Sequence, residues 1–517
     1  MEASFKKSYA SLGADRLVLL WLGVWWIANL VQAGFTELAN DEAYYHMFAE
    51  RLAWGYFDHP PVTALLVWAG ERLFGGELGV RFFFTVLQPL YLYILWRIIR
   101  PADADRRDAA LFVVLSASTL MLQLYGFIAV PDGPLMMTTA LFLLTFKWFS
   151  ENRRCAWLWM GVAMALMAYS KYHGALVVLF ALAATPPRLF LRPTLYLSGA
   201  VALLLLVPHF VWQYEHDWAS FAYHLSGRNS VFRPGYVVEF LANVLVVFNP
   251  FFVPLYVQAW RKVKPQTPVG RALKLLPVAF IVFFMLSSLR GYVQPQWVIV
   301  AVFGLLYTLF TYARRHPRTR RYLMRMGWVT LALIALTRLV MIFNPLGIRF
   351  EVFNNPESYA AIAAEADGRP VVFRYGYAVA AKYAFYTGGE AYCQPNIRYR
   401  THQWQFRDDD TRFAGREVLV ECPAPSGADT TGRIRTIRLA NGRSFTWFVD
   451  PDFRPVRLVD VSFAGLPEQT AAGDTLRLDL TLSNPYPYDI PIDGATCLAM
   501  IWKHGRFRVE EFPLANR

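Results

Sequence analysis

The chain has 517 residues, of which 56% are hydrophobic and only 17% are charged. This composition excludes an ordinary soluble enzyme, because soluble domains carry about 25% charged residues. The formal net charge of +13 does not indicate nucleic-acid binding, since the basic residues lie in short loops between apolar segments rather than on one face of a domain. We therefore predict an α-helical polytopic membrane protein.

Apolar segments recur along residues 1–345, and most are close to the ~20 residues that a helix needs to cross a bilayer. The interval 156–185 is also apolar, but Ser170, Lys171 and His173 interrupt it, so we predict two short helices that meet at a polar turn. With that interval counted twice, the sequence predicts about eleven spans. The other predicted spans are 16–34, 79–96, 108–125, 133–149, 194–213, 236–259, 272–289, 293–312 and 325–343.

The lysines and arginines between these segments agree with a single topology, because positively charged loops tend to stay in the cytoplasm. If Lys6 and Lys7 are inside, every later basic loop falls on the same side of the membrane. These loops are 97–107, 147–154, 186–192, 261–266 and 314–321. The opposite side receives 35–78, 126–132, Lys171, 214–235, 290–294 and everything after about 345. An open alternative is a cleaved signal peptide ending near VQA, which would leave the later topology unchanged.

The composition changes near residue 346, where a soluble outer domain is predicted to begin. Residues 346–450 contain the strand-like runs RPVVFRYGY and EVLVECP around a helix-like AVAAKYAFYT, which is typical of a small α/β unit. Residues 451–517 alternate strand-like runs with turn residues, as a compact β-sandwich would. In an oxidising compartment we expect one disulfide, between Cys393 and Cys422, with a third cysteine of this domain, Cys497, left over.

Polar chemistry is concentrated in the first loop, TELANDEAYYHMFAERLAWGYFDHPPV (36–62). Asp41 and Glu42 begin a segment with the spacing of an interfacial helix, which would hold both carboxylates at the membrane surface. Asp58 and His59 precede a double proline, which predicts a rigid, extended connection. The alternative for the first acid is that Asp41 only caps the helix, with Glu42 in the first turn where the helix dipole favours an acid.

Further charged residues are predicted on the same membrane face as this loop. Asp132 lies in YGFIAVPDGPL between two spans, where an ordinary turn-forming acid is the alternative. Lys171 lies in YSKYHG, His224 and Arg228 lie in YHLSGR, and Arg290 lies in RGYVQPQW. Acids and cations that converge at one interface suit a reaction on a lipid-linked phosphate.

The residues DEAYY and GYFDHPP resemble the first external loop of the GT-C glycosyltransferases in the protein O-mannosyltransferase and aminoarabinose-transferase group. The acid pair, the Pro-Pro run, Asp132 and the SKYHG turn recur in the right order, so the resemblance covers most of residues 10–345. It implies a GT-C membrane domain over residues 1–345 and inverting transfer of a sugar from a polyprenyl-phosphate donor to a lipid, glycan or protein acceptor. The resemblance also implies the bacterial cytoplasmic membrane, with residues 346–517 in the periplasm.

The resemblance also implies roles for single residues. Asp41 matches the essential acid and would be the base, while Asp132 or Glu42 would orient the acceptor or the sugar. The aminoarabinose branch has an arginine at the position of Tyr44 and a lysine at that of His59, so the residues do not support aminoarabinose as the sugar. The predicted substrate contacts are Tyr44, Tyr45, Asp58, His59, Arg81, Lys171, His224, Arg228 and Arg290, with Lys171 and Arg228 assigned to the donor phosphate.

Such a transfer requires no cofactor, because polyprenyl phosphate is already a good leaving group. A divalent metal remains an open alternative, with Asp58, His59 and His224 as mixed oxygen and imidazole ligands. Two other functions also remain open. A flippase or transporter of a lipid-linked sugar should place charges inside its spans, near the bilayer midplane, and a non-catalytic scaffold would use the external domain for binding.

Overall fold

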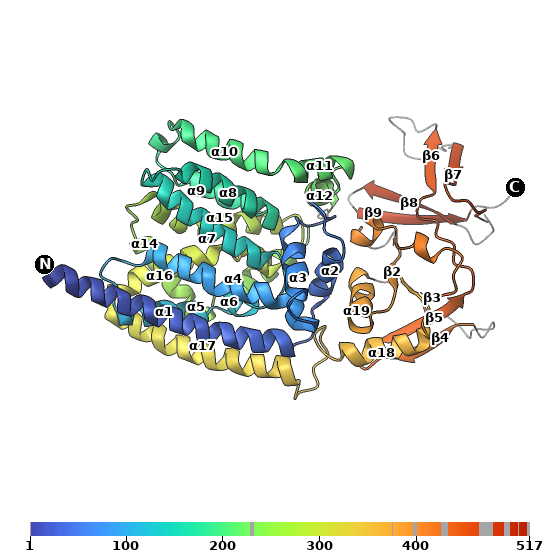
Figure 1. The fold of residues 1–517 in the computed structure, drawn as a ribbon, viewed down its shortest axis with the longest axis horizontal. Helices are drawn as coiled ribbons and strands as arrows, with labels where there is room; N and C mark the ends of the chain where they lie inside the picture. Colours follow the sequence, from blue (N-terminus) through green and yellow to red (C-terminus); the bar gives the residue numbers. More distant parts are fainter. Residues whose placement is uncertain are drawn as a thin grey trace. The chain divides into compact units, whose positions relative to one another are not determined.

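The computed structural model describes residues 2–227, 232–374, 376–395, 401–424, 433–464, 479–490, 497–504 and 506–513. The chain divides into two compact units, Met1–Phe353 and Asn354–Arg517. The first unit is helical, and the second contains all the strands of the described residues (Figure 1).

Helices occupy each segment of the first unit that the sequence predicts to cross the membrane (Figure 1). Four of them are long and apolar enough to span a bilayer alone, and two bent pairs raise this number to six among the described residues. The four are α1 (Glu2–Phe35), α4 (Gly76–Ile99), α15 (Pro268–Ser288) and α17 (Pro317–Phe343). The multi-pass membrane architecture is thus confirmed, whereas the number of about eleven spans stays a prediction.

The two bent pairs differ in how sharply they bend. α10 (Pro193–Leu205) and α11 (Val207–Glu215) meet at 45°. α13 (Pro234–Val247) meets the segment Pro250–Lys262, which contains α14 (Val253–Lys262), at 87°. The second bend follows Asn249, which has a positive φ of 76°, and Pro250 has no N–H to donate.

The remaining helices of this unit are shorter. Lys171 has an extended backbone, with φ −163° and ψ 138°, and separates α8 from α9. The two short helices predicted within 156–185 are therefore confirmed. The shorter helices are α2 (Asn40–Ala49), α3 (Val62–Glu71), α5 (Arg106–Ala117), α6 (Leu120–Leu124), α7 (Asp132–Ser150), α8 (Ala156–Ser170), α9 (Gly174–Ala183), α12 (Ala219–Ala222) and α16 (Ala301–Arg314).

α1 and α17 run parallel along one side of the bundle (Figure 1). The rings of Trp21 and Trp328 lie 6.3 Å apart, and further along both helices Arg338 donates to Asn29. The chain after α17 therefore returns to the face where α1 ends. There the backbone N–H of Asn40 donates to the Glu351 carboxylate at 3.3 Å.

The second unit contains a five-stranded sheet with the order β2-β1-β3-β5-β4. β1 pairs in parallel with β2 and β3, and β5 pairs antiparallel with β3 and β4. Together with two helices, these strands form the small α/β unit expected from the sequence. The elements are α18 (Asn355–Ala366), β1 (Val371–Phe373), α19 (Tyr377–Thr387), β2 (Ala391–Cys393), β3 (Val418–Glu421), β4 (Arg435–Arg438) and β5 (Ser444–Asp450).

The β-rich end of the chain consists, in its described residues, of two separate antiparallel pairs. β6 (Asp460–Ala464) pairs with β7 (Asp479–Ser483), and β8 (Cys497–His504) pairs with β9 (Arg506–Pro513). The strand-like runs are confirmed as strands. The two larger packed sheets of a β-sandwich are not formed by the described residues.

The predicted disulfide between Cys393 and Cys422 is wrong, because both thiols are free. Cys393 ends β2 and Cys422 follows β3, and β1 lies between these two strands. Two strand spacings are about 9.6 Å, which exceeds the ~7 Å that a disulfide bridges between Cα atoms. Burial also raises the pKa of the Cys393 thiol to about 12, so this thiol stays protonated and unreactive.

Candidate active site

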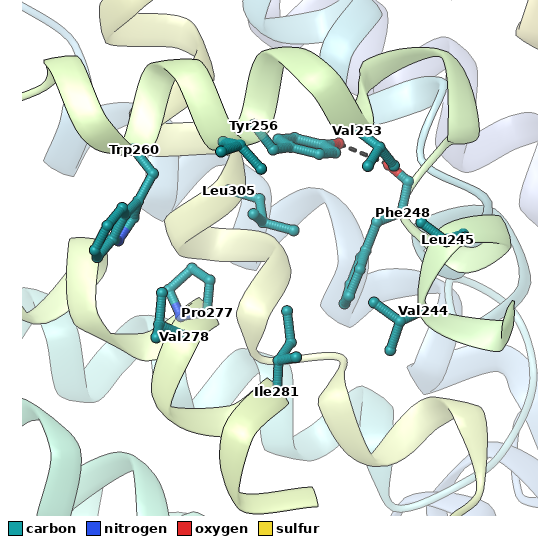
Figure 2. Close-up of a pocket in the computed structure, with 11 residues that line it drawn as sticks. Val244, Leu245, Phe248, Val253, Tyr256, Trp260, Pro277, Val278, Ile281 and Leu305 are labelled. Atoms are coloured by element: carbon teal, nitrogen blue, oxygen red, sulfur yellow. Dashed lines mark hydrogen bonds between the residues drawn. The ribbon is translucent and has the colours of Figure 1, made fainter. Parts of the chain in front are cut away.

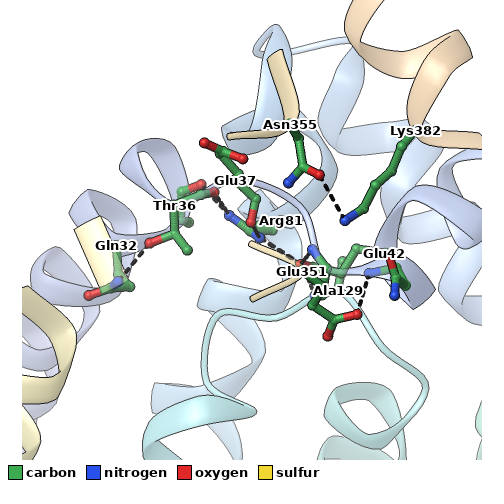
Figure 3. A network of polar contacts seen from close by, with 12 residues as sticks. Gln32, Thr36, Glu37, Glu42, Arg81, Ala129, Glu351, Asn355 and Lys382 are labelled. Carbon is green, nitrogen blue, oxygen red and sulfur yellow. Dashed lines mark hydrogen bonds and ion pairs between the residues drawn. The ribbon is translucent and has the colours of Figure 1, made fainter. Parts of the chain in front are cut away.

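A buried ion pair fixes the beginning of α2. The Glu42 side chain is fully buried and accepts hydrogen bonds from Nε and Nη2 of Arg81, both at 2.6 Å. The same carboxylate accepts from the backbone N–H groups of Ala39 at 2.9 Å and Ala129 at 2.8 Å. These bonds join α2 to α4 and to the loop before α7 (Figure 3).

Arg81 uses its other N–H groups to hold the segment between α1 and α2. Nη1 donates to the carbonyls of Ala33, at 3.0 Å, and Thr36, and Nη2 donates to that of Glu37 at 3.0 Å. Together with the two bonds to Glu42, these contacts use all five guanidinium N–H groups. A substrate contact of Arg81 or Glu42, as predicted from the sequence, would therefore require breaking one of these bonds.

Asp41 has a different environment from its neighbour. It is the second residue of α2 and is half-buried, and the N-cap of this helix is Ala39. The alternative in which Asp41 is the N-cap is therefore wrong, although its place in the first turn still suits the helix dipole. Asp41 adjoins Glu42, which accepts from the backbone N–H of Ala129, so the segment that leads to Asp132 lies beside the start of α2.

Asp132 and Lys171 form a second buried ion pair. Asp132 is the first residue of α7, and Lys171 follows the last residue of α8. Nζ of Lys171 lies 2.7 Å from Oδ1 of Asp132, and the two residues are 6% and 2% exposed. Because an ammonium has three N–H groups, this bond leaves Lys171 with donors for a further oxygen.

The structure brings the predicted metal ligands of the first loop and of the segment after α12 together. Nε2 of His224 lies 2.9 Å from the Asp58 carbonyl oxygen, and the rings of His59 and His224 are 6.4 Å apart. Among the described residues, however, no three His, Cys, Asp or Glu side chains are arranged to hold a metal ion. A metal requirement thus stays a prediction without a preformed ligand set.

The remaining predicted contacts differ in accessibility. Tyr44 and Tyr45 are buried, and each packs edge-on against Phe48. Arg290 is exposed just after the end of α15. Arg228 lies outside the described residues.

Sequence analysis missed a hydrogen-bond network that holds the first loop. His209 of α11 contacts the Trp54 carbonyl through Nδ1 at 2.7 Å and the Tyr172 hydroxyl through Nε2 at 3.2 Å. Gln213 donates to the same hydroxyl at 3.2 Å and to Ser220 at 2.7 Å. The available signal was the pair His209 and Gln213, two polar residues four positions apart and therefore on one face of the helix.

An apolar cavity of about 220 Å³, which we call the Tyr256 cavity, lies between α13, α14, α15 and α16 (Figure 2). Ile281 at its edge is one helical turn from Phe284, whose ring lies 5.1 Å from that of His173 near Lys171. The cavity is lined by Val244, Leu245, Phe248, Val253, Tyr256, Val257, Trp260, Pro277, Val278, Ile281 and Leu305.

Comparison with known proteins identifies the architecture. Residues 58–212 match the family model of dolichyl-phosphate-mannose-protein mannosyltransferase. The chain is similar to ArnT from Cupriavidus metallidurans in the apo state, with a TM-score of 0.61, 16% identity, and coverage of 83% of this chain and 97% of ArnT. The chain has the GT-C fold of ArnT.

The structure of the same ArnT bound to undecaprenyl phosphate gives a TM-score of 0.63 with the same identity and coverage. The resemblance to the protein O-mannosyltransferase and aminoarabinose-transferase group, based on the first loop, is thereby confirmed. A search of curated proteins finds no match.

Proposed function

We propose that this protein transfers a sugar from a polyprenyl-phosphate donor to an acceptor hydroxyl at the outer face of the membrane, with inversion at the sugar carbon. The observation that carries the proposal is that the Glu42–Ala129 hydrogen bond holds the start of α2, which carries Asp41, beside the segment that leads to the buried Asp132–Lys171 pair. Further support comes from the mannosyltransferase match over residues 58–212 and from the likeness to ArnT, which has been solved with undecaprenyl phosphate bound.

The proposed reaction is a single displacement. Asp41 takes the proton of the acceptor hydroxyl, and the resulting oxygen forms a bond to the anomeric carbon of the sugar. The bond from that carbon to the phosphate oxygen breaks, and its electron pair leaves with polyprenyl phosphate. Lys171 donates to the leaving phosphate, and the charge-assisted bond stabilises the negative charge that develops there.

Glu42 and Arg81 are proposed to position these groups rather than to contact substrate. Glu42 adjoins Asp41 in α2 and binds the backbone of Ala129, three residues before Asp132. One carboxylate thereby fixes the spacing between the two segments that carry the proposed base and the Asp132–Lys171 pair. Such fixed geometry matters because displacement of a good leaving group depends mainly on positioning and on charge.

The experiment compares cells that lack this protein with cells that carry the wild type, Asp41→Asn or Glu77→Gln. Glu77 is the matched control, because it is also a half-buried acid in the first turn of a helix, α4. Mass spectrometry of envelope glycolipids and glycoproteins should reveal a sugar that depends on the wild-type protein. Glu77→Gln should keep this product, whereas Asp41→Asn should lower its formation by about 10²–10⁴, the usual contribution of a general base.

Two results would contradict the proposal. An envelope that is unchanged by loss of the protein would argue against glycosyl transfer altogether. Near-normal product with Asp41→Asn, at matched protein level, would move the base elsewhere, with Asp132 as the next candidate. Purified Asp41→Asn should still bind undecaprenyl phosphate, since asparagine keeps the size of the side chain, and loss of a negative charge does not weaken binding of an anion.

A further inference from the structure

A second cavity, of about 270 Å³, lies along α1, α5 and α17, and we call it the Arg338 cavity. Its wall is almost entirely apolar, and several lining residues, among them Trp21, Val24 and Trp328, are exposed on the bundle surface. The cavity is therefore open toward the membrane. Its lining also includes Ala335 and Arg338.

Arg338 is the cation of this cavity, and its contacts are to neutral groups. It donates to Asn29 Oδ1 at 2.7 Å, to the Gln123 carbonyl at 3.0 Å and to the Ala28 carbonyl at 3.4 Å. Its guanidinium carbon lies 5.5 Å from the centre of the Phe127 ring. Arg338 forms no ion pair with any of the described residues.

Arg81 provides a contrast within the same region. Its guanidinium also lies over Phe127, at 5.8 Å, but it is paired with the Glu42 carboxylate. A cation within a membrane span is costly unless an anion or water compensates its charge. Arg338 has no such carboxylate partner among the described residues, and it faces a cavity that is open to lipid.

The position of Arg338 matches that of a lipid head group. It lies five residues before the end of α17, which is about 8 Å along the helix axis from the face that carries the candidate site. The Trp21 and Trp328 ring contact lies ten residues deeper on α17, about 15 Å from Arg338. This length is half of the ~30 Å hydrocarbon core, so the cavity follows a single leaflet.

We propose that the Arg338 cavity binds a phospholipid with a net negative charge from the leaflet at the candidate-site face. Its phosphate contacts the Arg338 guanidinium, and one acyl chain lies along the apolar wall toward Trp21 and Trp328. The site is distinct from the Asp132–Lys171 pair. Its occupancy can therefore be tested by binding alone, whether or not the protein transfers a sugar.

Lipid binding at this site would also support the segment that leads to Asp132. Arg338 and Asn29 donate to the carbonyls of Gln123 and Gly126, at 3.0 and 3.1 Å, and this segment continues to Ala129 and Asp132. A phosphate bound to Arg338 offsets the positive charge of the guanidinium that donates to the Gln123 carbonyl.

The experiment measures retention of phosphatidylglycerol and phosphatidylcholine by the purified full-length protein with native mass spectrometry. Arg338→Gln should lower the affinity for phosphatidylglycerol by at least about tenfold, as expected for loss of a charge-assisted phosphate contact. Arg338→Lys should retain part of the binding. Arg325→Gln is the control, because Arg325 is an exposed arginine near the opposite end of the same helix, and it should bind phosphatidylglycerol like the wild type.

A second variant keeps the charge and fills the cavity. Ala335 is exposed and lines the cavity one turn from Arg338, so Ala335→Phe should exclude the acyl chain and weaken binding even if Arg338→Gln fails to fold. Equal retention of phosphatidylcholine, or wild-type binding by both Arg338→Gln and Ala335→Phe, would overturn the proposal. Displacement of phosphatidylglycerol by undecaprenyl phosphate in the wild type, but not in Arg338→Gln, would assign the cavity to polyprenyl phosphate instead.

Discussion

Asp41 and Glu42 are adjacent acids of α2, but Glu42 is fully buried and Asp41 is only half-buried. Successive residues of an α-helix point about 100° apart, so one of two neighbouring acids can face the interior while the other faces the site. Glu42 is enclosed by Arg81 and two backbone N–H groups, whereas Asp41 is half-buried. The sequence predicts the acid pair as functional, but only the three-dimensional contacts separate a positioning acid from a candidate base.

The first prediction concerns the Glu42–Arg81 pair. Glu42→Ala and Arg81→Ala should each destabilise the protein by roughly 3–5 kcal/mol, because each leaves a buried charge without its partner. The double variant should be destabilised by much less than the sum of the two, since neither charge remains. Unfolding in detergent measures this coupling, with Glu77→Ala as the control. Additive effects would mean that the two side chains act independently.

The second prediction concerns Lys171, which is proposed to serve both Asp132 and the donor phosphate. Lys171→Met should lower the affinity for undecaprenyl phosphate by roughly tenfold or more, as expected for one charge-assisted contact. The variant should also be less stable, because Asp132 stays buried without a cation. Adding Asp132→Asn should restore stability while binding stays weak. Recovery of binding together with stability would make the pair purely structural.

At the scale of elements, the sequence predicted where helices form better than how they bend. The apolar periodicity located α1, α4, α15 and α17, and the polar interruption at Lys171 located the break between α8 and α9. The sharp bend after Asn249 depends on packing around a backbone with positive φ, which no periodicity reports. α2 was predicted as an interfacial helix, yet most of its residues are buried, because α3 and the aromatic side chains around Phe48 enclose it.

Long-range packing, which the sequence does not show, also explains why the predicted Cys393–Cys422 disulfide is wrong. Two cysteines near strand ends suggest a bridge when the strand order is unknown. β1 inserts between β2 and β3 in the sheet, although it precedes both in the chain, and this order separates Cys393 from Cys422. Sheet order follows from long-range pairing, which a single sequence does not show.

The third prediction assigns the Tyr256 cavity to the polyprenyl chain, because its edge is one helical turn from the residues around Lys171. Val278→Trp should fill the cavity and lower the affinity for undecaprenyl phosphate by roughly tenfold, since each buried CH₂ contributes about 0.8 kcal/mol. Binding of a short geranyl phosphate should be unchanged. Val282→Trp is the control, on the same helix and exposed outside the cavity wall. Equal effects on long and short lipids would argue against this assignment.

At the scale of the whole molecule, the charged contacts of the first unit separate into two groups at opposite ends of the bundle. At one end Arg100 pairs with Asp15, and Arg314 pairs with Asp108 and Asp103. The other end carries α2 and the Glu42–Arg81 and Asp132–Lys171 pairs. Two of the basic loops that were assigned to the cytoplasm, 97–107 and 314–321, thus lie together, as the single topology requires.

The last prediction is that this topology holds in the cell, with the candidate site and the C-terminal unit outside. α1 and α17 run parallel, and Glu351 contacts Asn40, so the chain leaves the bundle on the face of the candidate site. Cys155 is exposed at the start of α8, beside a basic loop, and should resist a membrane-impermeant maleimide in intact cells. A Cys155→Ser chain with Gly75→Cys should react, because position 75 is exposed, has an ordinary φ of −85° and leaves open space for a side chain.

Both labelling chains should have serine at the other cysteines, so that each reports one loop, and permeabilised cells provide the control in which both sites react. A phosphatase reporter fused after Arg517 should be active, because this enzyme requires the oxidising outer compartment for its disulfides. Labelling of Cys155 in intact cells, combined with a silent reporter, would invert the topology. The proposed base would then face the cytoplasm, and the donor would have to present its sugar at the cytoplasmic leaflet. The Arg338 cavity would likewise bind its lipid from the cytoplasmic leaflet, so both proposals would have to be changed.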